Sequence, residues 1–196
     1  MPADWSRYTS YPAYVFGFHG CDVSVGESIL SGQVPHLKPS ENDYDWLGHG
    51  IYFWEANPAR ALEFAGERKN GKPVSQGQVE TPFVLGAIID LGQCLNLLDS
   101  RVFQELKDAY GILESSQKVL PTNGKEKLLR KLDCAVIETL HAARATVSEA
   151  SYQTVRGVFP EGKEVYPNAG FKDKDHIQIC VRDLSCIKGY FRPIPG

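Results

Sequence analysis

Three short segments of this sequence combine imidazole, aromatic or amide side chains with glycine or with a strand-like apolar run. They are Phe18-His19-Gly20-Cys21, Gly48-His49-Gly50-Ile51-Tyr52-Phe53-Trp54 and His176-Ile177-Gln178-Ile179-Cys180-Val181-Arg182-Asp183. Glycine allows positive φ and lets the backbone approach a ligand closely. Histidine and glutamine can hold hydroxyl groups by hydrogen bonds, and a tyrosine ring can stack on a flat ligand. Taken singly, these residues are more typical of a turn, a core strand and the solvated face of an edge strand.

The common nucleotide-binding and hydrolase motifs are absent from the sequence. It contains no G-x-G-x-x-G, no G-x-x-x-x-G-K-[ST], no H-E-x-x-H and no G-x-S-x-G. Loops of these kinds cradle phosphates, bind zinc or expose a nucleophilic serine. A nucleotide site in this chain must therefore be built in another way.

Together and in this order, the three segments resemble the ADP-ribosyltransferase superfamily. The closest likeness is to its H-Y-E branch, which includes the diphtheria-toxin-like enzymes and the poly-ADP-ribose polymerases. His19-Gly20-Cys21 matches H-G-[ST], with cysteine in the last place, and Gly48 to Phe53 matches G-x-G-[IL]-Y-F. Asn57-Pro58-Ala59-Arg60-Ala61 opens the expected helix, and Gln178 stands where the branch has glutamate. The resemblance covers residues 1–65 and 154–192.

We expect a helical insertion around residues 99–150, which has no counterpart in the family. The resemblance implies an α+β fold with a split, mixed or antiparallel sheet and flanking helices. It also implies a site that cleaves NAD between nicotinamide and ribose. His19 would hydrogen-bond the adenosine-side ribose, and the Gly20 backbone would hold the nicotinamide carboxamide. Tyr52 would stack on the nicotinamide. Phe64, twelve residues later, is either a second stacking ring or core packing.

Gln178 is the main departure from the family pattern. The glutamate of the family binds the 2′-OH of the nicotinamide ribose, and glutamine can make that bond but carries no charge and is no base. Either the chain is an H-Y-Q transferase, or a carboxylate comes from the preceding loop, or the chain is inactive. The loop candidates are Glu161, Glu164, Asp173 and Asp175.

In such transferases the loop before the third residue faces the acceptor. Here this loop covers residues 160–175, and we expect its acceptor-facing residues to include Glu161, Lys163, Glu164, Lys172 and Asp175. A plain solvated loop has the same composition. Without a base, the acceptor favoured is a nitrogen of a nucleic-acid base, ahead of protein, because its lone pair needs little activation. Arg156, Lys163, Lys172, Lys174 and Arg182 form a local basic surface or are scattered charges.

The function expected from the resemblance is a mono-ADP-ribosyltransferase with NAD as substrate and no metal. Its acceptor would be RNA, DNA or protein. A small enzyme of this kind looks like the toxin of a toxin–antitoxin or phage-defence system, with a neutralising antitoxin as a partner. Two alternatives remain open: an inactive module that binds NAD, ADP-ribose or protein, and an NAD glycohydrolase that transfers to water.

The local patterns predict the elements that position these residues. Strands are expected at 13–18, 50–54, 83–91, 154–159, 177–182 and 188–191. A capping box at Ser24 and Glu27 predicts a short helix that ends near Gly32, and Asn57-Pro58 predicts another helix start. Two amphipathic helices are expected after Asp99 and at 128–140. Loops are expected at 35–46, 69–81 and 160–176.

Length and composition fit one globular domain, residues 1–196. The chain has 42% hydrophobic and 23% charged residues and a formal net charge of −3, which argues against a protein-wide basic field. No apolar run reaches the length of about 20 residues that spans a bilayer. The first residues lack a signal-peptide pattern, and the five scattered cysteines favour reduced core residues in a cytoplasmic protein.

Overall fold

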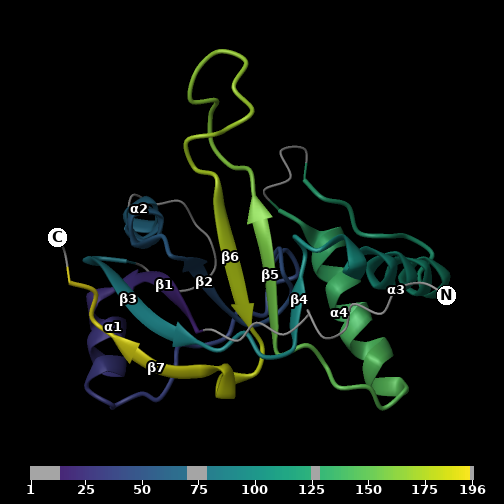
Figure 1. Ribbon diagram of the computed structural model, residues 1–196, viewed down its shortest axis with the longest axis horizontal. Helices are drawn as coiled ribbons and strands as arrows, with labels where there is room; N and C mark the ends of the chain where they lie inside the picture. The colour runs from purple at the N-terminus through teal and green to yellow at the C-terminus, as the bar shows by residue number, and fades with distance from the viewer. Residues whose placement is uncertain (1–13, 70–78, 125–128, 195–196) are drawn as a thin grey trace.

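The computed structural model describes residues 14–69, 79–124 and 129–194. Its centre is a seven-stranded sheet with the order β4-β5-β6-β2-β1-β3-β7 (Figure 1). The strands are β1 (Val15–Asp22), β2 (Ile51–Glu55), β3 (Pro82–Ile89), β4 (Cys94–Asn96), β5 (Thr154–Phe159), β6 (His176–Val181) and β7 (Ile187–Phe191). β4 and β5 are parallel, and the other neighbouring pairs are antiparallel. The expected α+β class with a mixed sheet is confirmed.

Among the described residues, four α-helices flank the sheet, and the core forms two clusters. They are α1 (Val23–Leu30), α2 (Pro58–Lys69), α3 (Phe103–Ser116) and α4 (Lys131–Thr146). α1 and α2 contact β1 and β3, whereas α3 and α4 pack on each other near β4 and β5 (Figure 1). One apolar cluster surrounds Phe53 and Leu85, and the other surrounds Leu95 and Ile137. The expected helical insertion is present, because α3 and α4 lie between β4 and β5 in the chain.

The ladder between β1 and β2 is short. The two strands pair only at Gly17–Glu55 and Phe18–Trp54. Beyond that point β1 continues along β3 as far as Asp22, and β2 continues along β6. The β1–β2 ladder therefore ends before His19, and this point within the seven-stranded sheet is called the split below.

Several expected boundaries are wrong, and strand pairing explains most of them. β1 runs to Asp22 rather than Phe18, because it pairs with β3 over its whole length. His19 is therefore inside a strand and not at its end. The cap of α1 is Asp22, whose side chain accepts the Ser24 N–H, and not Ser24 itself. β4 has only three residues and was not expected.

The remaining helix starts agree better with the local signals. The Asn57 side chain accepts the backbone N–H of Arg60, which confirms the predicted start of α2. Asp99 caps a 3₁₀ turn, Ser100–Val102, that leads into α3. α4 begins at Lys131, later than expected, and Leu128 lies outside the described residues, as does most of the expected loop at 69–81.

Helix α2 packs directly on β1 at Gly20. A Cβ atom on Gly20 would lie 2.0 Å from the backbone oxygen of Ala61 and 3.3 Å from Cβ of Ala65. Backbone atoms cannot yield to such an overlap as a flexible side chain can. The glycine after His19 therefore has a packing role, whatever else it does.

We expect Gly20→Ala to lower the free energy of unfolding by about 3 kcal/mol or more, since overpacking already costs about 1–3 kcal/mol where side chains can adjust. Gly66→Ala, on the same helix α2, is the matched control, because nothing lies within 4 Å of its Cβ position. Alanine there should raise stability by about 0.5–1 kcal/mol. Urea denaturation measures both, and equal stability of Gly20→Ala and wild type would contradict the packing role.

Candidate functional site

His19 and Tyr52 meet where β1 and β2 stop pairing. Nδ1 of His19 lies 2.7 Å from the carbonyl oxygen of Tyr52. A carbonyl oxygen only accepts hydrogen bonds, so Nδ1 carries the proton and donates it. Burial holds the pKa of His19 below its usual value of 6.5, although the Tyr52 carbonyl opposes that shift. The ring is therefore neutral at pH 7, and its Nε2 lone pair can accept a hydrogen bond from a hydroxyl group.

The phenol group of Tyr52 is engaged within the protein. Its O–H donates to the Gly48 carbonyl at 2.7 Å and accepts the Leu47 N–H at 2.9 Å. Burial raises the pKa of Tyr52 well above its usual value of 10, so the group is neither acid nor base at neutral pH. A ligand can therefore use the half-buried ring of Tyr52 but not its oxygen.

Gln178 lies on β6, an interior strand between β5 and β2, so the edge-strand interpretation is wrong. Its Cα partner on β2 is Trp54, and the partner of Tyr52 is Cys180. Side chains two positions apart share a face of the sheet, so Tyr52, Trp54 and Gln178 lie on the same face.

His19 is placed differently. By the same alternation it faces the other side of the sheet, where its ring lies 6.0 Å from that of Phe53. Among the described residues no hydrogen bond joins His19 to Gln178. The structure therefore does not bring these two predicted site residues together on one face of the sheet.

Trp54 was not singled out from the sequence, although it follows Tyr52 by two residues and so shares its face. It is only 4% exposed, and its buried indole Nε1 has no hydrogen-bond partner within the described part of the chain. The Phe64 ring lies 4.9 Å from the Trp54 ring and that of His176 lies 6.1 Å away. Phe64 thus packs on Trp54, which agrees with its core-packing interpretation.

Arg60 is a second residue that the sequence did not reveal. It is 6% exposed, and its Nη2 donates to Glu161 at 3.2 Å. Its Nε is buried and has no hydrogen-bond partner among the residues that the structure describes. Glu161 also lies 3.8 Å from Nδ1 of His176. Glu161 is thereby a loop carboxylate that lies close to both Arg60 on α2 and His176 on β6.

The other loop carboxylates hold the loop together. Asp175 accepts the backbone N–H of Glu161 and of Lys172, Asp173 accepts that of Lys163, and Glu164 accepts that of Asn168. The loop projects beyond the sheet between β5 and β6 (Figure 1). Near its tip Tyr166 and Phe171 are 57% and 67% exposed.

The five basic residues considered as a nucleic-acid surface do not act as one patch. Three of them are in ion pairs: Arg156 with Glu55, Lys174 with Glu63 and Glu67, and Arg182 with Glu138. Lys163 and Lys172 remain exposed on the loop. Of the five, Lys163 and Lys172 are therefore the pair that the loop presents to solvent.

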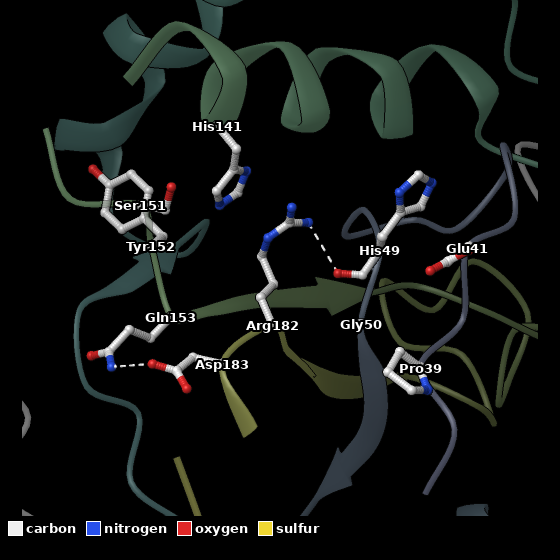
Figure 2. Close-up of a pocket in the computed structure, with 10 residues that line it drawn as sticks. All are labelled: Pro39, Glu41, His49, Gly50, His141, Ser151, Tyr152, Gln153, Arg182 and Asp183. Atoms are coloured by element: carbon white, nitrogen blue, oxygen red, sulfur yellow. Dashed lines mark hydrogen bonds between the residues drawn. The ribbon is translucent and has the colours of Figure 1, made fainter. Parts of the chain in front are cut away.

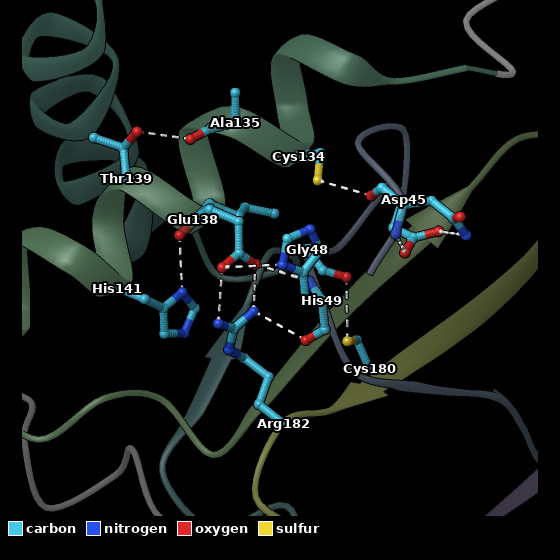
Figure 3. Close-up of polar contacts among 12 residues, drawn as sticks. Asp45, Gly48, His49, Cys134, Ala135, Glu138, Thr139, His141, Cys180 and Arg182 are labelled. Carbon is cyan, nitrogen blue, oxygen red and sulfur yellow. Dashed lines mark hydrogen bonds and ion pairs between the residues drawn. The ribbon is translucent and has the colours of Figure 1, made fainter. Parts of the chain in front are cut away.

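The Gly48-His49-Gly50 turn is docked on α4 by Glu138 (Figure 3). Glu138 accepts the His49 N–H at 2.8 Å and the Arg182 guanidinium at 2.5 and 3.0 Å, and Arg182 also donates to the His49 carbonyl at 3.0 Å. Gly48 has a φ of +78°, and a Cβ atom there would lie 2.5 Å from Oε1 of Glu138. The first glycine of the motif thus serves the docking of the turn.

A cavity of about 400 Å³ lies beside this turn, with His49, His141, Tyr152 and Arg182 around it (Figure 2). Another cavity, of about 420 Å³, lies between α3, α4 and β5 and is lined mainly by apolar side chains. Neither cavity is lined by His19, Tyr52 or Gln178.

The five cysteines have free thiols, and all but Cys94 are buried. Burial raises the pKa of Cys21 and of Cys134 to about 12, so neither is a nucleophile at neutral pH. In the described part of the chain, histidine, cysteine and carboxylate side chains form no group that could hold a metal ion. Within the same part, no helix has the length and apolar character needed to cross a bilayer.

Comparison with known proteins leaves the family open. No protein-family model matches the chain. The sequence is 26% identical over 190 residues to an uncharacterized protein of Methanocaldococcus jannaschii. The aligned region covers 87% of this chain and 83% of the archaeal protein. The similarity extends through nearly the whole chain but brings no function with it.

Removing the Glu138 charge should destabilise the protein, because Arg182 loses its ion-pair partner and the single oxygen of glutamine cannot replace both carboxylate oxygens toward Arg182 and the His49 N–H. We expect Glu138→Gln to lower the free energy of unfolding by about 2–4 kcal/mol at neutral pH, as for other partly buried ion pairs. Glu114→Ala on α3, where the carboxylate only accepts the exposed Tyr110 hydroxyl, is the control and should cost about 0.5 kcal/mol or less.

The difference in stability between wild type and Glu138→Gln should decrease as the pH falls. Although burial favours the neutral acid, the bonds from Arg182 and His49 hold the pKa of Glu138 below its usual value of 4.5. The stabilisation is then complete above that value and is lost as the pH falls through the pKa of the folded protein. Denaturation curves of wild type and Glu138→Gln should differ at neutral pH and coincide at acidic pH, below the pKa of Glu138 in the folded protein. A difference in stability that stays constant with pH would contradict the assignment.

Proposed function

We propose that this chain is an NAD-dependent mono-ADP-ribosyltransferase with the ADP-ribosyltransferase fold and an H-Y-Q triad, His19, Tyr52 and Gln178. The observation that carries the proposal is the hydrogen bond from His19 to the Tyr52 carbonyl at the point where the β1–β2 ladder ends. It leaves a neutral imidazole with an acceptor lone pair, which suits a ribose hydroxyl donor. The family resemblance likewise assigns His19 a hydrogen bond to a ribose, the one on the adenosine side of NAD.

In the proposed reaction the bond between the nicotinamide nitrogen and C1′ of the ribose breaks, and its electron pair leaves with nicotinamide. The ribose becomes cationic, the lone pair of the acceptor forms the new bond to C1′, and the acceptor proton passes to solvent. The protein has to bind and orient NAD and stabilise the developing charge. Tyr52 offers its ring for stacking, and the Gly20 backbone is the proposed partner of the carboxamide.

Gln178 supplies a hydrogen bond to the reacting ribose but no base. The acceptor must then already be nucleophilic, and a nitrogen of a nucleic-acid base meets this condition better than a hydroxyl or guanidinium group. The projecting loop supports contact with unpaired bases, because exposed Tyr166 and Phe171 lie near Lys163 and Lys172. Rings that stack on bases and lysines that meet phosphates are the usual combination for single strands.

The proposed setting is the cytoplasm, where NAD is available and free thiols persist. There the enzyme would act as a toxin of a toxin–antitoxin or phage-defence system and would be held in check by an antitoxin. This part of the proposal is supported by the family resemblance alone. A binding module without turnover is the second candidate, and the uncharged Gln178 is the observation that favours it.

Removal of the triad side chains should separate binding from chemistry. We expect His19→Ala and Tyr52→Ala to reduce nicotinamide release from NAD about 100-fold or more, and Gln178→Ala to lower kcat more than it raises KM. Tyr52→Phe should keep most activity, because the phenol oxygen serves Leu47 and Gly48 instead of a ligand.

The matched controls are His36→Ala, a half-buried histidine near Tyr190, and Gln104→Ala on α3, which bonds only Asp108. Both should release nicotinamide at the wild-type rate. Thermal unfolding checks that each variant is folded. A folded His19→Ala protein with wild-type turnover would show that the site is elsewhere.

The fate of labelled NAD distinguishes the candidate functions. With a cell lysate we expect one ADP-ribose per acceptor site and no polymer, since Gln178 cannot activate a ribose hydroxyl for chain growth. The label should resist protease and disappear with nuclease. Loss with protease alone would mean a protein acceptor, free labelled ADP-ribose would mean a glycohydrolase, and no nicotinamide release would mean a binding module.

A further inference from the structure

The amide of Gln178 is in contact with a buried histidine on the same strand. Its Nε2 lies 3.0 Å from Nε2 of His176, and the other ring nitrogen of His176, Nδ1, lies 2.6 Å from the Lys174 carbonyl oxygen. The Lys174 carbonyl can only accept, so Nδ1 of a neutral His176 carries the proton. Nε2 of His176 then has a lone pair and accepts a hydrogen bond from the Gln178 NH₂ group.

The imidazole has little freedom to turn away from this arrangement. His176 is 6% exposed, and its ring lies 5.7 Å from that of Phe159 and 6.1 Å from that of Trp54. A half-turn of the ring would place a carbon against the Lys174 carbonyl and lose that hydrogen bond. Close packing on both sides therefore keeps the lone pair of Nε2 directed at Gln178.

We propose that His176 is a positioning residue that fixes the Gln178 amide, so that its NH₂ group is engaged and its oxygen, Oε1, is left for the substrate. Among the described residues Oε1 has no hydrogen-bond partner. This inference rests on the proposed function, in which a sugar hydroxyl is the donor that Oε1 receives. A glutamine held in this way presents the substrate with an acceptor oxygen, as a carboxylate would.

Protonation of His176 would reverse the amide. A doubly protonated ring donates from both nitrogens, so Gln178 would have to offer Oε1 to His176 and turn its NH₂ toward the substrate. The groups that face the ring are Glu161 from the loop, Arg60 from α2 and Asp175 beside it. Burial lowers the pKa of His176 below 6.5 in spite of the two carboxylates. At neutral pH the ring is therefore neutral, and the Gln178 oxygen Oε1 stays directed at the substrate as an acceptor.

The first test reads the side chains directly and needs no NAD. In ¹⁵N-labelled protein, long-range ¹H–¹⁵N correlation of the imidazoles should show His176 as the Nδ1–H form at pH 7.5. Gln178→Glu should raise the pKa of His176 by about one unit or more, because a carboxylate favours a charged ring. Gln178→Met should leave the Nδ1–H form in place. An Nε2–H form in wild type, or an unchanged pKa in Gln178→Glu, would overturn the proposal.

The second test follows nicotinamide release against pH. Wild-type kcat should fall about 10-fold per pH unit below the pKa of His176, as expected when only the neutral ring is competent. His176→Gln should keep kcat at pH 7.5 within about 3-fold, because its amide oxygen can accept from Gln178. It should lose the part of the acidic decline that follows the His176 pKa and keep only the part that protonation of His19 causes. His176→Ala should lower kcat about 10-fold with little change in KM.

His36→Gln is the control and should keep the wild-type pH profile. Thermal unfolding of His176→Gln, which preserves side-chain size, shows whether the fold is intact. An acidic decline that persists unchanged in His176→Gln would overturn the positioning role. If wild type releases no nicotinamide at any pH, the proposed function fails, and the imidazole spectra still decide how Gln178 is held.

Discussion

One hydrogen bond joins the two parts of the sheet at the place where its ladder is interrupted. β1 and β2 share two residue pairs and then follow different neighbours, and the bond from His19 to the Tyr52 carbonyl lies immediately beyond the last pair. Without it, a buried imidazole and a carbonyl at the split would both lack a partner, which is costly in a protein interior. The same bond fixes the tautomer of His19 and so decides which nitrogen a ligand can meet.

Backbone carbonyl oxygens fix the tautomers of three histidines, His19, His141 and His176. Nδ1 of His19, His141 and His176 each lies within 2.8 Å of a backbone carbonyl. In each ring the proton is therefore on Nδ1, and burial lowers the pKa of all three groups. A neutral ring held in this way is an acceptor on its far side. In the proposed function, His176 engages the Gln178 NH₂ group and leaves Oε1 to accept a hydrogen bond from a hydroxyl group.

The residues that carry the family resemblance also carry packing. Gly20 admits α2, Gly48 admits Glu138, and Tyr52 bonds the loop before its own strand. Packing alone would explain why these residue types occur at these positions, even in a protein without catalysis. The fold by itself therefore does not distinguish an enzyme from a binding module. The proposed chemistry would use atoms that packing does not engage, chiefly Nε2 of His19 and Oε1 of Gln178.

The sequence by itself determined the elements whose signals are local. Thr154–Phe159 was predicted as a strand with the bounds it has, and Asn57-Pro58 marked the start of α2, because side-chain alternation and capping depend on neighbours in the chain. The α+β class and the helical insertion followed from the same signals. The order His19, Tyr52, Gln178 was also visible, since it needs only spacing and residue type.

Tertiary structure decided what depends on partners far away in the chain. The three residues of β4 form a strand only because β5 lies beside them, and β1 continues to Asp22 only because β3 does. Trp54, Arg60 and His176 acquired their roles from contacts with Phe64, Glu161 and Gln178. Lys174 and Arg182 lost their expected place in a basic surface to carboxylates on helices. Pairing register and burial arise between distant segments, and no local pattern encodes which segments will meet.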